Sequence, residues 1–132
     1  HYSKWYENWA PLIGRVLFGG LFIFGAMWKI PGTESFMAEV GMTAAKGIPF
    51  ANVAVILAGI FEAVLGLCLI VGYHTRTSAM ILALMTVAFT IIFHLNFSDP
   101  MQIGQFVTHL GLISGLLYIS VYGAKSYAVS KD

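Results

Sequence analysis

The apolar run over residues 52–72 constrains the fold of this chain more than any other stretch. It holds about twenty apolar residues, enough for a helix that crosses a bilayer, and a single charge, Glu62, interrupts it near the middle. An ionisable group at that depth costs several kcal/mol unless it meets a partner or water. Its helical neighbours include Gly59 and Gly66, and a stripe of small side chains lets another helix approach closely. We therefore predict that Glu62 faces the inside of a helical bundle.

Composition points to an integral membrane protein. Of the 132 residues, 58% are hydrophobic and 10% are charged, whereas soluble domains carry about 25% charged residues. No stretch is long and polar enough to be a linker, so we expect one membrane domain over residues 1–132. The net charge of +1 indicates no nucleic-acid partner. The one cysteine, Cys68, lies inside the central run, which excludes an intrachain disulfide and a CxxC redox pair.

Three more apolar stretches accompany the central run, and together they predict four membrane spans. Pro11 suits the first position of the first helix, and Thr77 or Ser78 suits the cap of the third. The chain is thus expected to be all-α, an integral membrane four-helix bundle. The predicted spans cover residues 11–28, 52–72, 78–94 and 101–122.

The segment over residues 33–47, between the first two spans, is too polar to cross the membrane. Its apolar residues nevertheless recur at helical spacing, with Thr33 suited to the N-cap and Gly47 to the stop. We predict a short amphipathic helix that lies flat on the membrane or over the bundle.

Four spans place both termini on the same side of the bilayer. That side holds more lysine and arginine than the other, and short basic loops stay in the cytoplasm. We therefore predict that both termini are cytoplasmic. Residues 1–10, with Trp5 and Trp9, are expected to lie at the membrane surface, and no cleavable signal peptide is recognisable. The cationic residues counted on the cytoplasmic side are Lys4, Arg15, Arg76, Lys125 and Lys131, against Lys29 and Lys46 on the other.

Arg15, one turn inside the first span, is the first candidate partner for the buried carboxylate. An arginine near a helix end often extends to the lipid headgroups, and an inward-facing ion pair is the other interpretation. The estimated depths of Arg15 and Glu62 differ by about 10 Å, which only the long arginine side chain can span. We predict a structural ion pair between Arg15 and Glu62, with water able to bridge it.

Polar side chains follow one face of the third span and one face of the fourth. Thr86, Thr90 and His94 recur every four residues on the third, and Gln105 and His109 share a face of the fourth. Both histidines lie toward the outer ends of their helices. The sequence therefore predicts a ligand slot in the outer half of the bundle, lined by Trp28, Glu62, Thr90, His94, Gln105 and His109.

Three interpretations of this slot stay open. In the structural one, the polar groups bond to their own or neighbouring helices and Glu62 is protonated or paired. In the second, a quinone is bound, because its carbonyls need hydrogen-bond donors in an apolar slot and a histidine can exchange its proton. The third, a haem held by His94 and His109, is favoured least because their estimated depths are poorly matched. The sequence holds no zinc-type cluster of cysteine and histidine, so no metal site is expected, and four short unbroken helices give little basis for a transporter.

Several segments of the chain resemble the DoxX family of small four-helix bacterial membrane proteins. They are GRVLFGGLFIFGAMWKIPG, GIFEAVLGLCLIVGYHTRTSAMILAL, FHLNFSD and THLGLISGLL. The most specific pieces are Gly14-Arg15, Lys29, Glu62 and the Gly72-x-x-Thr75-Arg76 turn, taken together and in order. The resemblance implies a multi-pass protein of the bacterial cytoplasmic (inner) membrane. The family is named after a subunit associated with quinol oxidase and with electron transfer from thiosulfate to quinone.

Two functions from different classes follow as expectations. The first is an integral membrane subunit of a quinone-linked redox system, which binds quinone or quinol while a partner protein supplies the oxidisable substrate. In that case the chain is part of a quinone-dependent oxidoreductase, since it has no cofactor motif to run the chemistry alone. The alternative is a structural or accessory subunit of a larger complex, with no activity of its own. Both expect contact with the lipid bilayer and with a protein partner or further copies of this chain.

Overall fold

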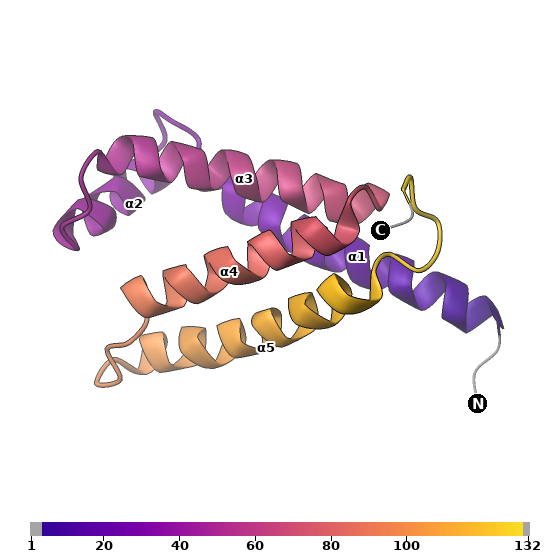
Figure 1. Cartoon of the computed structure of the whole chain (residues 1–132). Helices are drawn as coiled ribbons and strands as arrows, with labels where there is room; N and C mark the ends of the chain where they lie inside the picture. The colour runs from indigo at the N-terminus through magenta and orange to yellow at the C-terminus, as the bar shows by residue number, and fades with distance from the viewer. Residues whose placement is uncertain (1–3, 131–132) are drawn as a thin grey trace.

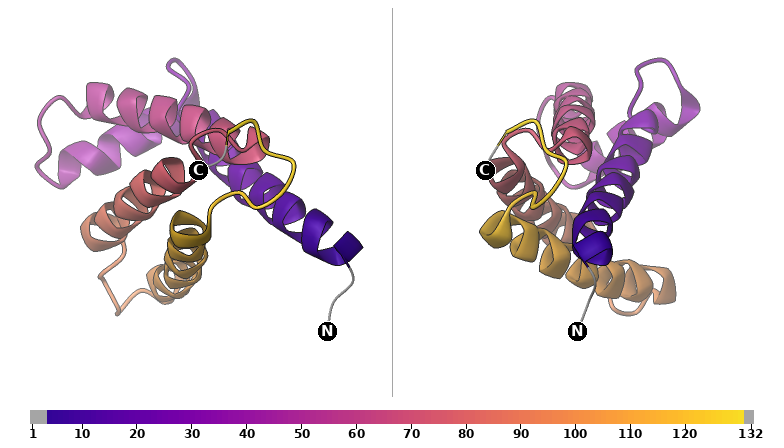
Figure 2. Two further views of the ribbon diagram at one scale, coloured as in Figure 1. Left: turned by 45° about the vertical axis from the view of Figure 1, so that its right-hand side comes forward. Right: turned by 90° about the vertical axis from the view of Figure 1, so that its right-hand side faces the viewer.

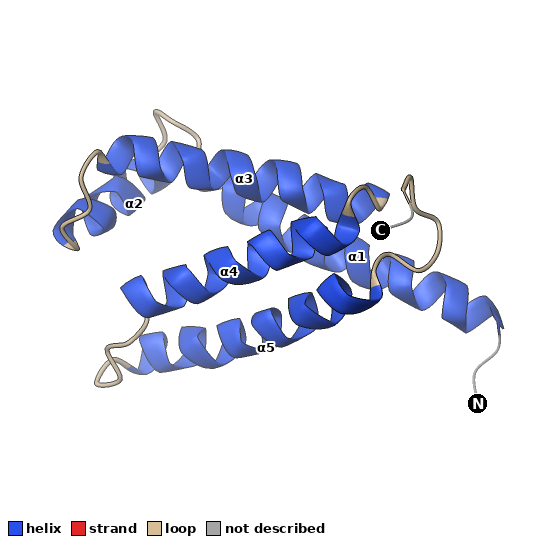
Figure 3. Ribbon diagram, viewed as in Figure 1, coloured by secondary structure: helices blue, strands red, loops and turns tan. Residues whose placement is uncertain are grey.

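The computed structural model describes residues 4–130, and within them the chain is helical with no strand. Four of its helices are long and apolar enough to cross a membrane, which confirms the all-α, four-span prediction. The shorter helix between the first two spans is also present, as predicted. The helices are α1 (Lys4–Met27), α2 (Glu34–Ala45), α3 (Ala51–Val71), α4 (Thr75–Phe93) and α5 (Pro100–Tyr122) (Figures 1 and 3).

The four long helices form two pairs. Helix α1 packs along α3, and α4 packs along α5, while α3 and α4 contact each other next to the tight turn that joins them. From that turn the two pairs diverge toward the opposite end of the molecule (Figure 1). Helix α2 packs against α3, beyond the end of α1 (Figures 1 and 2). The start of α1, the α3–α4 turn and the segment after α5 share one end, as an even number of spans requires.

Local sequence explains most of the helix ends. The Thr33 hydroxyl accepts a hydrogen bond from the backbone N–H of Phe36, which confirms Thr33 as the N-cap of α2. The Asp99 carboxylate caps α5 in the same way through Met101, with Pro100 at the first helical position. Gly72 ends α3 in the left-handed conformation, at φ 75°, which suits a residue without a side chain.

Two predicted helix starts are wrong. Helix α1 begins at Lys4, so Pro11 lies inside the helix and not at its first position. The aromatic segment before Pro11 therefore continues the helix; residues 1–3 of the predicted surface segment, and Lys131 of the topology argument, lie outside the described residues. Helix α4 begins at Thr75, and its N-cap is His74 in the left-handed conformation, in place of Thr77 or Ser78. Because Gly72 and His74 both take positive φ, the chain reverses within three residues and the helix resumes earlier than its composition suggests.

The core lies where the two pairs meet. Between α1 and α3, Gly19 and Gly66 face each other so closely that a Cβ on either would clash with the backbone carbonyl oxygen of the other. Ala79 and Ala83, four residues apart on α4, are both buried. Leu116 is the one residue of α5 that is buried, so α5 presents most of its surface outward. The remaining buried hydrophobic residues of this cluster are Phe22, Leu69 and Leu82.

Candidate functional site

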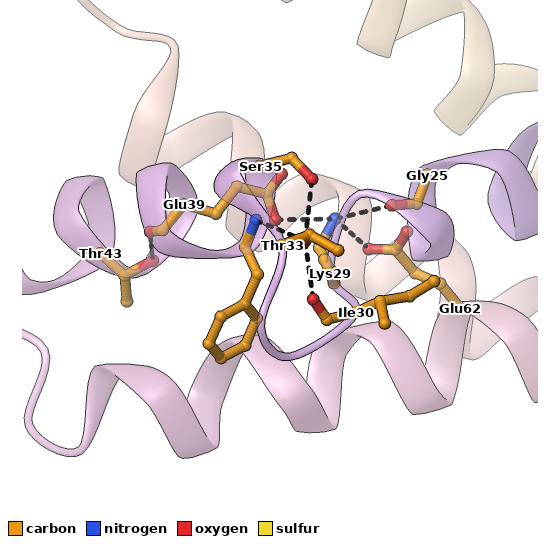
Figure 4. A network of polar contacts seen from close by, with 9 residues as sticks. Gly25, Lys29, Ile30, Thr33, Ser35, Glu39, Thr43 and Glu62 are labelled. Carbon is orange, nitrogen blue, oxygen red and sulfur yellow. Dashed lines mark hydrogen bonds and ion pairs between the residues drawn. The ribbon is translucent and has the colours of Figure 1, made fainter.

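Glu62 is buried on α3 and forms an ion pair with Lys29, in the loop that follows α1. The Lys29 Nζ lies 3.2 Å from Glu62 Oε1, and the two side chains are 15% and 7% exposed. The same Nζ lies 3.5 Å from Glu39 Oε2 on α2 and donates to the carbonyl oxygen of Gly25 at 3.4 Å. One cation is therefore shared by two carboxylates, and it connects α1, α2 and α3 (Figure 4).

Glycines make room for this network. A Cβ on Gly25 would lie 2.8 Å from Glu62 Oε2, and a Cβ on Gly59 would lie 2.9 Å from the Cβ of Lys29. The carboxylate thus lies over one glycine and the lysine stem over the other. This arrangement explains why Glu62 lies on a stripe of small side chains.

The predicted ion pair between Arg15 and Glu62 is wrong. Arg15 is 2% exposed, and its guanidinium donates to carbonyl oxygens: from Nη1 to Leu69 at 3.3 Å, and from Nη2 to Ser126 at 2.5 Å and Tyr127 at 3.1 Å. The physical reason is depth. Arg15 lies level with the last turn of α3, where carbonyls lack helical partners and the helix dipole attracts a cation.

Lys29 is the functional residue that sequence reasoning assigned to a different role. In the sequence analysis Lys29 is only one of the cations on the outer side and one of the residues that carry the family resemblance. The available signal was its position four residues after Gly25, on the face that α1 turns toward α3.

A second polar group joins α4 to α5. The Thr90 hydroxyl lies 2.8 Å from His109 Nδ1, and the rings of His94 and His109 are in edge-to-face contact, with centroids 4.9 Å apart. Thr90 is 4% exposed, while the two histidines are half-buried. The structure therefore brings together Thr90, His94 and His109, three of the six residues predicted to line the slot.

Hydrogen bonding fixes the tautomer of His109. The Thr90 hydroxyl donates its single hydrogen to the carbonyl oxygen of Thr86 at 2.7 Å, so toward the imidazole it acts as acceptor. Nδ1 of His109 must then carry the proton, and Nε2 of the neutral ring is left as an acceptor. His94 Nδ1 is buried and has no hydrogen-bond partner among the described residues. His109 Nε2 is thus the ring nitrogen of this group that is left to accept a further hydrogen bond.

The other three predicted residues lie apart from this group. Glu62 is engaged by Lys29, as described above. Trp28 is 51% exposed and packs edge-on against Phe24, with ring centroids 6.2 Å apart. Gln105 lies on α5, one turn before His109, and is exposed. Within residues 4–130 no three histidine, cysteine or carboxylate side chains are grouped to hold a metal ion.

Comparison with known proteins supports a membrane role. A family model described as DoxX matches residues 10–95. This range covers α1 from residue 10 onward and all of α2, α3 and α4, with Lys29, Glu62, Thr90 and His94. The chain is 28% identical over 128 residues to "Inner membrane protein YqjF" of Escherichia coli (strain K12), which covers 95% of this chain and 92% of that protein. No solved structure matches the chain. The matches, together with the four apolar helices, identify a membrane protein and support the inner membrane as its location.

Proposed function

This chain belongs to the DoxX family, and from that premise we propose that it binds the head group of a quinol or quinone at Thr90, His94 and His109. The observation that carries the proposal is the pair of imidazoles in contact, with one buried nitrogen unpartnered and a second nitrogen free to accept. Quinols are lipophilic, so they reach such a group from the bilayer between apolar helices.

The hydroxyl of a quinol is the natural donor to His109 Nε2. When an electron leaves a quinol its hydroxyl proton leaves as well, and a positioned imidazole can take it. Thr90 keeps the ring in place by accepting from Nδ1, and His94 lies edge-on beside it. The electrons pass to a redox centre of a partner protein, since this sequence has no cofactor motif of its own.

The Lys29–Glu39–Glu62 network has a separate role in this proposal. Its ion pairs connect α1, α2 and α3, so we assign it to the packing of these helices and not to contact with the ligand. We also propose that both termini are cytoplasmic, which places the two histidines in the outer half of the membrane. Cysteine labelling at Ser126 in a background without Cys68 tests this orientation, and reaction from the periplasm would reverse it.

Quinone content decides the proposal. The protein is purified in native lipid, its quinone is extracted and quantified per chain, and its melting temperature is measured on the same preparation. His109→Leu should lower the bound quinone about tenfold, since one hydrogen bond to the ligand is lost, while the fold keeps its α4–α5 packing. Thr108→Leu is the matched control, because Thr108 is the exposed neighbour on the same turn. No quinone in the parent, or equal quinone in the two variants, refutes the proposal.

A second function, an accessory subunit that anchors a larger complex, is favoured by the exposure of α5. With Leu116 its one buried residue, this helix has most of its surface available to a neighbouring protein. Purification in mild detergent distinguishes the two: a stoichiometric partner together with an absence of quinone supports the accessory role alone.

A further inference from the structure

A cavity of about 270 Å³ lies between α1 and α5, at the end of the molecule that holds the α3–α4 turn. We call it the α1–α5 slot. A second cavity of about 480 Å³ adjoins it, since both are lined by Pro11 and Lys125, and continues along the start of α1 past Tyr6 and Glu7. The residues that line the α1–α5 slot include Gly14, Arg15, Phe18, Tyr118, Ile119 and Lys125.

The inner part of the α1–α5 slot is apolar. The Phe18 ring lies directly against Gly115, where a Cβ would come 2.5 Å from its Cζ, so α1 and α5 contact each other at this point of the slot. Tyr118 and Ile119 form the α5 wall. A Cβ on Gly14 would meet no atom within 4 Å, which leaves this part of α1 open. The space suits a hydrocarbon chain that lies along the two helices.

The end of the slot near the α3–α4 turn carries excess positive charge. Arg15 lines it, and no carboxylate among residues 4–130 forms an ion pair with this buried guanidinium. Its contacts are carbonyl oxygens, and its Nε is buried without a partner. Lys125 lies at the rim, with Nζ 5.4 Å from the centre of the Tyr122 ring. Glu7 is the one acid in the combined lining.

An uncompensated buried cation beside an apolar space is complementary to an anionic amphiphile. We propose that the α1–α5 slot binds an anionic phospholipid of the cytoplasmic leaflet, with its phosphate against Lys125, attracted by the Arg15 charge, and one acyl chain along Phe18 and Ile119. Basic pockets between membrane helices on the cytoplasmic side hold anionic headgroups in this way. The lipid supplies the counter-charge that the described protein lacks at Arg15. This site is independent of the quinol site, which lies between α4 and α5.

Competition between two lipids tests the proposal. The purified protein in mild detergent is given equal amounts of phosphatidylglycerol and phosphatidylethanolamine, and native mass spectrometry measures which lipid is retained. The parent should retain phosphatidylglycerol about fivefold over phosphatidylethanolamine, as expected for one cationic contact near an anionic headgroup. Lys125→Gln should remove this preference, and Lys125→Arg should keep it. The quinone content should not change in either variant.

A substitution that fills the α1–α5 slot gives a second test of the proposal. Gly14→Leu places a side chain in the α1–α5 slot and should lower phosphatidylglycerol retention several-fold. Gly20→Leu is the matched control, because Gly20 also lies on α1 with nothing within 4 Å of a Cβ but does not line the slot. Melting temperatures of the delipidated variants verify folding, and if Gly14→Leu does not fold, the Lys125 pair decides alone. Equal retention of both lipids by the parent, or equal phosphatidylglycerol retention in the two leucine variants, overturns the proposal.

Discussion

The two helix pairs differ in the kind of polar side chain that they bury. Where α1 meets α3, the polar groups are charged. Lys29 forms ion pairs with Glu62 and Glu39, and Arg15 donates to carbonyl oxygens. Where α4 meets α5, the polar groups are neutral, and His94 keeps a buried nitrogen without a partner. Ion pairs between helices connect the elements of the bundle, whereas a buried ring nitrogen without a partner marks a candidate contact for a ligand. We therefore propose a structural role for the ion pairs of the first pair and ligand binding for the polar group of the second.

The two helix pairs also differ in how closely their helices approach each other at glycine positions. Gly19 and Gly66 bring α1 and α3 into backbone contact, while a Cβ on Gly104 or Gly111 of α5 would meet nothing within 4 Å. The first pair is therefore in closer contact along its shared face, and α5 of the second pair leaves more of its surface open to lipid, ligand or partner.

The largest expected effect is on the charged network. Lys29→Met leaves Glu39 and Glu62 without their cation and should lower the free energy of unfolding by about 3 to 5 kcal/mol. Thermal unfolding in detergent measures it, with the exposed Lys46→Met as control. Adding Glu62→Met should recover part of the loss, because no uncompensated carboxylate then remains on α3. If instead an Arg15→Met change gives the recovery, the partner of Glu62 has been assigned wrongly.

A smaller effect is expected from packing. Gly66→Ala forces a methyl group against the carbonyl oxygen of Gly19 and should cost about 1 to 3 kcal/mol. Gly111→Ala, made in the open face of α5, should be neutral or stabilise the helix by up to about 1 kcal/mol. Melting temperatures of the two variants test the contrast between the pairs. Equal destabilisation would mean that α5 is packed against something as closely as α1 is.

The smallest effect on stability is expected at the histidine group. Thr90→Val keeps the shape of the side chain but removes the acceptor for His109 Nδ1, at a cost of about 1 kcal/mol. Bound quinone should nevertheless fall markedly, since the ring loses the contact that fixes its tautomer and direction. Thr77→Val, at an exposed position of the same helix, is the control. A Thr90→Val protein that keeps its full quinone content would contradict the role given to this hydroxyl.

The sequence predicts the helices well and their partners less well. Hydropathy and capping residues such as Thr33 and Gly72 are local signals, so the spans and the short α2 follow from them directly. The start of α4 does not, because two residues with positive φ, Gly72 and His74, replace a conventional cap. The ion pair of Glu62 depends on which helices are adjacent and on the depth of each residue. Arg15 in α1 and Lys29 directly after α1 are both possible cationic partners. Only the packing of α1 on α3 shows which of them reaches Glu62.

Only three of the six residues predicted to line the slot lie together, because the sequence does not show which helices are adjacent. Residues that share a helix face or lie on a sequential hairpin, such as Thr90, His94 and His109, can be grouped from spacing alone. Glu62 and Trp28 belong to the other pair, and no pattern within a single helix reveals that the two pairs diverge.

Photolabelling tests the proposed site most directly. A quinone that carries a photoreactive azide is bound to the membrane-embedded protein, activated by light and located by mass spectrometry of the peptides. We predict adducts near the outer ends of α4 and α5, within residues 86–97 and 105–113, and competition by an unlabelled quinone. Adducts confined to α1 and α3, or labelling that unlabelled quinone does not reduce, would contradict a quinol site at His94 and His109.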